Sequence, residues 1–246
     1  MFKYELSEVI SFRKTTEQFG GLSNMATGYP LFVNDIQFST SEALYQACKF
    51  PDYPDIQSII LKESSPMAAK MKIKPFKAKI RKDWLNIRVG IMEWCLSVKL
   101  YQHPNGFGNL LLSTGGKSIV EDSWRDTFWG AKLRDGYFEG HNILGTLLMR
   151  MRDFWIENHN KQLRNFLSPP KVVDAYLLGR QINNVKYYVE LEQKGEAIRQ
   201  ERELKAKKPI PRGHDQRQVG ELKVRKPPPN YSQMNLLAFC SPGIKK

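Results

Sequence analysis

Acidic, aromatic and amide side chains gather in the middle of this chain, between apolar segments. Glu121 ends one apolar stretch, Asp126 and Trp129-Gly130 follow shortly afterwards, and Asn142 precedes the next apolar stretch. A carboxyl group can move a proton, and an aromatic ring can stack on a planar ligand. This part of the sequence therefore predicts a site that binds a planar group and transfers a proton.

A short hairpin and a capped helix are predicted earlier in the chain. Residues 31–33 and 36–38 read as two strands, and Asn34 and Asp35 between them tolerate the positive φ of a two-residue turn. Ser39–Glu42 then offer a helix N-cap with a Glu at the third position, followed by an apolar face. We expect a hairpin and, directly after it, a helix.

The rest of the first 160 residues is predicted to be mainly helical. Pro54 and Pro66 suit the first turns of two short helices. A long helix is expected from Asp83 to His103, because its apolar residues fall on one side, and a second long helix is expected from Asn142. The expected fold class is α+β, mainly helical, with a small β hairpin or sheet, because the pattern lacks βαβ alternation.

Charge and composition divide the chain. Its net charge is +13, and most of this excess lies beyond residue 160. Residues 161–194 hold enough Val, Leu, Ile and Tyr for one or two docked helices, whereas residues 195–246 are rich in Pro, Lys and Arg. The latter composition resists a packed core. We therefore expect a functional domain at 1–160, a helical extension at 161–194 and a basic, largely disordered tail at 195–246.

The same composition argues against several protein classes. No apolar run approaches the roughly 20 residues of a membrane-spanning helix, and the first residues lack the apolar segment of a secretory signal. Three cysteines without CxxC spacing and four histidines form no metal-ligand pattern. We expect a cytoplasmic protein without membrane contact, bound metal or cofactor.

Short motifs occur in one order over about residues 10–155. They are Phe19–Asn24, Ser41–Gln46 with Lys49-Phe50, Ala69-Lys70, Arg81–Trp84, Met92, Leu110–Gly115, Val120-Glu121, Asp126, Trp129-Gly130, Asn142, Leu144-Gly145 and Leu148-Met149. Each motif alone is weak, but so many in one order are hard to obtain by chance. As a set they resemble the NADAR (YbiA-like) family.

The resemblance implies a compact, mostly helical α+β fold and N-glycosidase activity, which hydrolyses the bond between a ribose and the nitrogen of a base or amine. The substrates it implies are ADP-ribose attached to guanine, in nucleic acid or nucleotide, and phosphoribosylamino-pyrimidine intermediates of riboflavin biosynthesis. Where the family usually has a His after the motif glutamate, this chain has Ala43, and Met71 and Lys72 follow Lys70 in place of Gly-Arg. These differences leave the choice of substrate open.

The chemistry of such a reaction suggests a role for each candidate residue. Breaking a ribosyl carbon–nitrogen bond builds positive charge on the sugar and negative charge on the base, so a carboxylate and a proton donor both lower the barrier. Glu42, Glu121 and Asp126 are the expected catalytic acids, with Glu42 or Glu121 managing the water and the proton. Lys70 is expected to anchor a phosphate or to attack the sugar as an amine. The expected substrate-binding residues, with the tryptophans stacking on the base and the asparagines holding ribose hydroxyls, are Asn24, Arg81, Trp84, Trp129, Gly130 and Asn142.

Purely structural interpretations stand beside these roles. Glu42 suits a capping box at a helix start, Asp126 suits a turn, and Glu121 suits a solvent-facing strand end. Trp84 lies on an apolar helix face and suits the core, whereas Asn142 suits a helix N-cap. The residue types alone leave both interpretations open at each position.

Three functions also stay open. The chain is interpreted first as a glycosidase acting on ADP-ribosylated guanine, with the basic tail and the basic run from Lys70 to Lys82 attracting a nucleic acid. Alternatively it acts on a small phosphoribosylated metabolite, and Lys70 is one solvated charge among many. A third interpretation is a module that binds ADP-ribose without cleaving it. The acids at positions 42, 121 and 126 argue against a pure binder, because carboxylates repel an anionic ligand.

Overall fold

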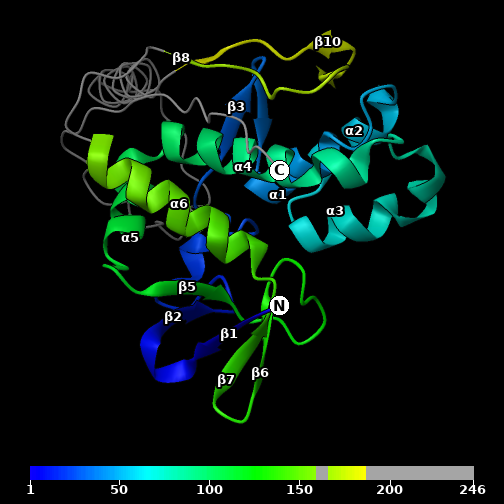
Figure 1. Cartoon of the computed structure of the whole chain (residues 1–246). Coiled ribbons are helices and arrows are strands. Elements are labelled where there is room, and N and C mark those ends of the chain that lie inside the picture. Colours follow the sequence, from blue (N-terminus) through cyan, green and yellow to red (C-terminus); the bar gives the residue numbers. More distant parts are fainter. Residues whose placement is uncertain (159–165, 187–246) are drawn as a thin grey trace, which may run out of the picture. The chain divides into compact units, whose positions relative to one another are not determined.

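Helices and several small sheets make up the structure, a computed structural model that describes residues 1–158 and 166–186 (Figure 1). The longer helices are α1 (Ser41–Ala47), α2 (Pro54–Lys62), α3 (Pro66–Ile73), α4 (Trp84–Gln102), α5 (Asn109–Leu112) and α6 (Ile143–Asn158). Tighter or wider helical turns are η1 (Leu6–Glu8), η2 (Gly20–Leu22), η3 (Lys74–Lys79) and η4 (Pro104–Gly108). The fold class is α+β, as expected. The predicted tail at 195–246 lies outside the described residues.

The strands form small sheets. Strands β1, β7 and β6 form an antiparallel sheet in that order, β2 pairs with β5 in parallel, and β3 pairs with β4. In the β3–β4 hairpin, Asn34 and Asp35 have φ of 53° and 63°, which confirms the predicted two-residue turn. The strands are β1 (Phe2–Glu5), β2 (Val9–Phe12), β3 (Leu31–Val33), β4 (Ile36–Phe38), β5 (Ser118–Glu121), β6 (Ala131–Arg134), β7 (Tyr137–Gly140), β8 (Phe166–Leu167), β9 (Tyr176–Leu177), β10 (Arg180–Gln181) and β11 (Val185–Lys186).

The predicted helix starts are confirmed. Helices α2 and α3 begin at Pro54 and Pro66, and the Ser65 hydroxyl accepts the Ala68 N–H at 3.4 Å. Helix α4 ends at Gln102, before His103, and α6 starts directly after Asn142. Within residues 1–158 and 166–186, none of the helices has the length and apolarity needed to cross a lipid bilayer.

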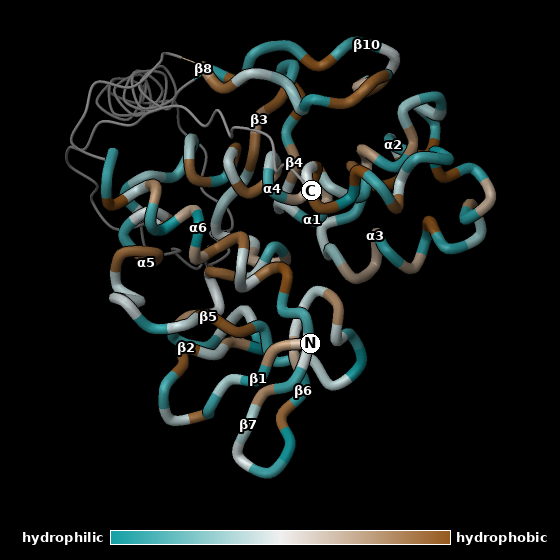
Figure 2. Tube along the Cα trace, in the orientation of Figure 1, coloured by the Kyte–Doolittle hydropathy of each residue, from teal (hydrophilic) through white to brown (hydrophobic). Residues whose placement is uncertain are grey.

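Helix α4 is the centre of the core. The one-sided apolar face predicted for it holds only for its first half, because Leu96 to Gln102 are all buried. Helices α1 and α6 and strand β3 all contact α4, which runs through the middle of the domain (Figure 1). Hydropathy changes from residue to residue along α6, as expected for a helix with one side on the core (Figure 2).

Residues 166–186 form short strands, so the helices predicted for this stretch are wrong. Leu178 and Gly179 take positive φ of 49° and 75°, which allows the tight β9–β10 turn. Strands β8, β9 and β11 each place one apolar side chain in the main core, as alternation along a strand predicts. The buried apolar residues of this stretch are Leu167, Leu177, Ile182 and Val185.

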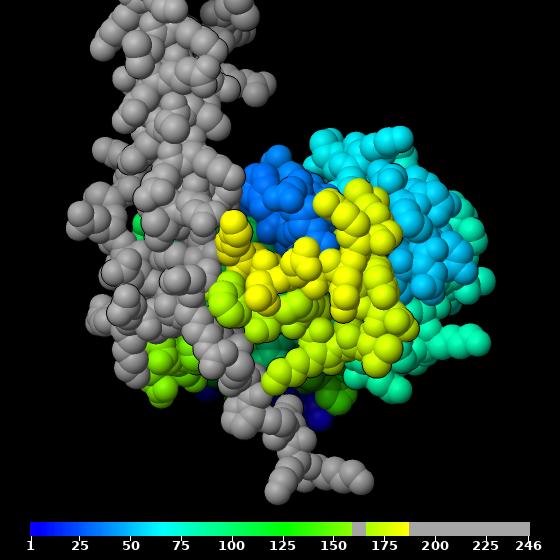
Figure 3. Space-filling view, turned by 90° about the horizontal axis from the view of Figure 1, so that it is seen from above, coloured from blue at the N-terminus to red at the C-terminus, as the bar shows by residue number. Residues whose placement is uncertain are grey.

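The segment 166–186 is joined to the preceding domain by hydrogen bonds. The side-chain nitrogen of Gln57 on α2 donates to the Tyr176 carbonyl at 2.9 Å, and the Trp94 indole donates to the Ser168 carbonyl at 3.0 Å. Figure 3 shows the yellow segment lying over the blue β3–β4 hairpin and against the cyan helices. The core therefore extends past residue 160, the boundary expected from composition.

Candidate active site

Glu42 is a buried carboxylate surrounded by donors. Its Oε2 accepts from Asn24 Nδ2 at 2.5 Å, its Oε1 accepts from Gln46 Nε2 at 2.7 Å, and Lys70 Nζ lies 3.2 Å from Oε1. Thr40 is the N-cap of α1 and accepts the Ala43 N–H at 3.1 Å. Because Glu42 is the second residue of the helix and its carboxylate bonds elsewhere, the capping-box interpretation is wrong.

A buried lysine holds the segment that carries Asn24. Lys99 Nζ donates to the carbonyls of Gly21 at 2.6 Å and Ser23 at 3.0 Å, and the Asn24 carbonyl accepts the Glu42 N–H at 2.9 Å. Burial lowers the pKa of Lys99 well below its usual value. Sequence analysis missed Lys99, because it lies within an apolar helix and nothing near it in sequence signals a buried cation.

Glu121 is the last residue of β5, and its pKa is raised. The pKa of Glu121 is raised to about 7, chiefly by burial and also by the charges of Asp126 and Glu42, while the charge of Lys70 opposes the shift. Asp126, Glu42 and Lys70 therefore all lie within electrostatic reach of Glu121. We call Glu42, Glu121, Asp126 and Lys70 the acid cluster.

Asn142 positions Glu121. Its Nδ2 donates to the Ile119 carbonyl at 2.8 Å, and its Oδ1 accepts the Glu121 N–H at 3.1 Å. The residue is fully buried and has a φ of 48°, so neither the expected ribose contact nor an ordinary N-cap describes it. Asn142 is a positioning residue for the end of β5.

Two glycines permit the close packing around β5. A Cβ on Gly130 would lie 2.5 Å from the Glu121 carbonyl oxygen, and one on Gly145 would lie 2.1 Å from the Ile119 oxygen. Such distances are far shorter than a van der Waals contact, so a side chain at either position would displace the strand. Gly130 therefore packs against the backbone of Glu121, and its expected substrate contact stays a prediction.

Asp126 combines a structural role with a charge near Glu121. It is exposed, and its Oδ1 accepts the N–H groups of Phe128 at 3.0 Å and Trp129 at 2.9 Å. This is the local bond pattern that makes Asp a turn residue. The turn former proposed as the structural interpretation is therefore present, and it holds Trp129 in place.

An aromatic wall stands beside the acid cluster. It consists of Tyr45, Trp84, Phe128 and Trp129, with ring centroids 4.9 Å apart for Tyr45–Trp84, 5.8 Å for Tyr45–Trp129 and 5.2 Å for Phe128–Trp129. Trp84 is buried, as its core interpretation requires, whereas Trp129 is half-buried. Of the two tryptophans, Trp129 has the surface available to stack on a base.

Lys49 is a further candidate that sequence analysis quoted in a motif but gave no role. Its Nζ lies 5.3 Å from the ring centroid of Trp84 and 5.5 Å from that of Tyr45. The pKa of Lys49 is lowered to about 8, chiefly by burial, with Glu42 opposing the shift and Lys70 adding to it. The sequence did contain a signal for Lys49. It is spaced by three and four residues from Gln46 and Tyr45, which are spaced in the same way from Glu42, so a helix brings the four side chains to one face.

Arg81 is engaged by a neighbouring acid and by the segment 166–186. Its guanidinium binds the Asp83 carboxylate at 2.6 and 2.9 Å and donates to the carbonyls of Val173 at 2.7 Å and Asp174 at 3.2 Å. The expected substrate-binding role is replaced by a structural one, because this side chain clamps the segment 166–186 to the domain.

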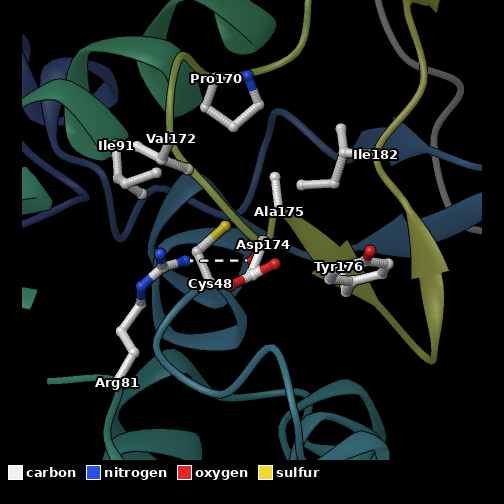
Figure 4. Close-up of a pocket in the computed structure, with 9 residues that line it drawn as sticks. All are labelled: Cys48, Arg81, Ile91, Pro170, Val172, Asp174, Ala175, Tyr176 and Ile182. Atoms are coloured by element: carbon white, nitrogen blue, oxygen red, sulfur yellow. Dashed lines mark hydrogen bonds between the residues drawn. The ribbon is translucent and has the colours of Figure 1, made fainter. Parts of the chain in front are cut away.

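A small cavity adjoins this clamp (Figure 4). About 10 Å³ of it can hold the centre of a water molecule, which is room for about one water. It is therefore too small for a nucleotide. Its lining residues are Cys48, Arg81, Ile91, Pro170, Val172, Asp174, Ala175, Tyr176 and Ile182.

Comparison with known proteins decides the family. Residues 11–155, more than half of the chain, match the NADAR domain. This chain belongs to the NADAR family. The NADAR segment contains every member of the acid cluster and of the aromatic wall, whereas the segment 166–186 lies beyond it.

Several relatives share the NADAR segment. N-glycosidase YbiA of Escherichia coli is 34% identical over 145 residues, covering 59% of this chain and 87% of YbiA. A maize protein named riboflavin biosynthesis protein PYRR, chloroplastic, is 36% identical over 159 residues, covering 59% of this chain and 25% of the maize protein. The NMR structure of E. coli YbiA superposes with a TM-score of 0.53 at 32% identity, covering 61% of this chain and 85% of YbiA.

Proposed function

We propose that this NADAR N-glycosidase hydrolyses a ribosyl carbon–nitrogen bond at the acid cluster, with ADP-ribosylated guanine, in nucleic acid or nucleotide, as its substrate. The observation that carries the proposal is the pair of glutamates in unlike environments. Glu42 is paired with Lys70, while burial raises the pKa of Glu121 to about 7. When the environments of two carboxyl groups differ in this way, one can donate a proton while the other stays ionised and stabilises positive charge.

In the proposed reaction Glu121 is the acid. The bond between the anomeric carbon and the base nitrogen breaks, the nitrogen keeps the electron pair, and Glu121 donates a proton to the base. The Glu42 carboxylate stabilises the positive charge that develops on the sugar. Water then bonds through its oxygen to the anomeric carbon, and its surplus proton returns to Glu121. Trp129 stacks on the base in this scheme, and Asn24 holds Glu42 in place.

A lysine route is the mechanistic alternative. A neutral amine bonds to the anomeric carbon, the protonated base leaves, the ring opens to an imine, and water releases the sugar and the amine. Lys70 is paired with Glu42, whereas burial lowers the pKa of Lys49 to about 8, so Lys49 is the better amine. Cyanoborohydride trapping followed by peptide mapping separates the routes, since only the lysine route leaves a sugar on Lys49 or Lys70.

A second substrate class is favoured by one of the comparisons. The 36% identity with the maize riboflavin biosynthesis protein favours phosphoribosylamino-pyrimidine intermediates. The net charge of +13 favours a nucleic-acid substrate, because basic surface attracts phosphates. Contact with nucleic acid through the basic tail and a cytoplasmic location both stay predictions.

The test of the proposed function is a product assay with the full chain. Purified protein is incubated separately with ADP-ribosylated guanosine and with a phosphoribosylamino-pyrimidine, and mass spectrometry identifies the released base and sugar. Release of guanine-containing product with free ADP-ribose supports the first substrate. Release from the pyrimidine compound alone supports the second, and release from neither contradicts both.

A further inference from the structure

Arg88 on α4 carries a positive charge that the protein itself leaves unpaired. Its Nε is buried without a hydrogen-bond partner, and none of the carboxylates in residues 1–158 and 166–186 forms an ion pair with it. Arginine is usually paired when it is partly buried, because desolvating a charge is costly. An unpaired guanidinium in this position therefore requires an explanation.

The aromatic wall holds Arg88 beside the acid cluster. Its guanidinium carbon lies 3.8 Å from the ring centroid of Phe128, whose ring also packs against Trp129. Glu42 and Arg88 both act on Tyr45: burial raises the pKa of Tyr45, Glu42 raises it further, and Arg88 opposes the rise. Both charges therefore act electrostatically on the Tyr45 hydroxyl.

The other cations near the site are already engaged or weakened. Lys70 pairs with Glu42, Arg81 pairs with Asp83, and burial lowers the pKa of Lys49 to about 8. Arg88 is stacked on a ring and presents several donors in a planar fork. That combination suits two oxygens of one phosphate.

We propose that Arg88 binds the phosphate on carbon 5 of the substrate ribose and so selects phosphorylated ribosyl compounds. This inference rests on the proposed function for the identity of the sugar, and it replaces Lys70 as the phosphate anchor. The shared chemistry is a ribose 5-phosphate group, which occurs as a monoester in phosphoribosyl metabolites and as part of a diphosphate in ADP-ribose. The contact of Arg88 with Phe128 would pre-orient the fork, so little side-chain freedom is lost on binding.

The experiment compares substrates with and without the phosphate. The kcat/KM of the wild type, Arg88→Gln and Arg88→Lys is measured for a phosphoribosylamino-pyrimidine and for the same compound after phosphatase treatment. A parallel arm uses ADP-ribosylated guanosine and the corresponding ribosyl-guanosine. Arg134→Gln, which removes an exposed arginine on β6, is the matched control.

We expect the wild type to prefer the phosphorylated compound, and Arg88→Gln to reduce that preference about 10- to 100-fold, mainly through KM, as loss of a charge-assisted hydrogen bond predicts. Arg88→Lys restores part of it, because lysine keeps the charge but not the fork. The arm in which the preference falls identifies whether the monoester or the diphosphate is the ligand. The proposal is overturned if Arg88→Gln lowers kcat/KM equally for the phosphorylated and the unphosphorylated compound, or if the preference is unchanged. Arg88 is then a packing residue.

A binding measurement separates this inference from the proposed function. Calorimetry with ribose 5-phosphate and with ribose needs no turnover. Tighter binding of the phosphate that is lost in Arg88→Gln supports the phosphate site, even if none of the ribosyl compounds is cleaved. Equal affinity of wild type and Arg88→Gln for ribose 5-phosphate contradicts it, even if cleavage is observed.

Discussion

Glu121 shows how one side chain acquires a chemical role from its surroundings. Its backbone N–H, at the end of β5, donates to the Asn142 side chain. Burial and neighbouring acids disfavour the charged form of its carboxyl group. A carboxyl group with a pKa of about 7 can donate a proton at neutral pH, whereas an ordinary glutamate is almost fully ionised there.

The first prediction concerns stability and pH. Because the pKa of Glu121 rises from 4.5 in the unfolded chain to about 7 in the folded chain, the folded state binds this proton more tightly. Stability is therefore lost as pH rises between about 4.5 and 7. Glu121→Gln removes the penalty, so we expect it to stabilise the fold by up to about 3 kcal/mol at pH 8 and by little at pH 4. Denaturant unfolding at both pH values measures this, and an equal effect at both would contradict the shifted pKa.

The second prediction uses the pH dependence of catalysis. If Glu121 is the acid, kcat/KM falls as pH rises through about 7. A neutral Lys49 with a pKa of about 8 as the reacting amine would produce the opposite trend, a rise through that pH. A pH profile of kcat/KM distinguishes the two, and a rising profile contradicts the role assigned to Glu121.

At the scale of elements, the site depends on how closely β5, β6 and α6 approach one another. Gly130 and Gly145 allow this approach, and the Asn142 amide joins the carbonyl of Ile119 to the N–H of Glu121. Helix α1 contributes Glu42 and α3 contributes Lys70, and an ion pair connects them. The acid cluster is therefore assembled from four separate elements and loops.

The third prediction tests the Asn142 contact. Asn142→Ala leaves the Ile119 carbonyl and the Glu121 N–H unpaired, so we expect a loss of about 2–5 kcal/mol of stability and a larger loss of activity than the remaining folded fraction explains. Asn86→Ala, at an exposed position on α4, is the control and should change stability by less than about 0.5 kcal/mol. Wild-type kcat in folded Asn142→Ala would show that Glu121 does not need this support.

Local patterns predicted the elements well, and tertiary contacts decided the rest. Pro54, Pro66 and the Asn34-Asp35 turn act through their own backbone, so the sequence around them is sufficient. The roles of Asn142 and Arg81 depend on partners far away in the chain. Asn142 bonds to Ile119 and Glu121. Arg81 bonds to Val173 and Asp174. Neither set of partners is visible in a local pattern.

At the scale of the whole molecule, the core does not end with the NADAR segment. Residues 11–155 match the family, yet four buried apolar side chains of the segment 166–186 belong to the same core. Composition placed the boundary near residue 160, because proline and basic residues become frequent there. The short strands that follow could not be predicted, since they gain stability only by packing on the domain.

The fourth prediction compares two truncations. Because the composition of residues 195–246 resists a packed core, we expect a chain ending at residue 187 to melt at the same temperature as the full protein. A chain ending at residue 160 loses four buried apolar side chains, each worth about 1.5–3 kcal/mol, so its melting temperature should fall by about 10 °C or more. Calorimetry measures both, and an unchanged melting temperature for the shorter chain would show that the segment 166–186 is not part of the core.

The most direct test of the acid cluster is product release by variants of its two glutamates. Glu42→Gln and Glu121→Gln are compared with the wild type and with Glu139→Gln, which removes a carboxylate on β7 that pairs with Lys3. Mass spectrometry of released base and sugar should show losses of about 10²- to 10⁴-fold for the two cluster variants and none for the control. Undiminished release by both Glu42→Gln and Glu121→Gln would contradict the assignment of the reaction to this site.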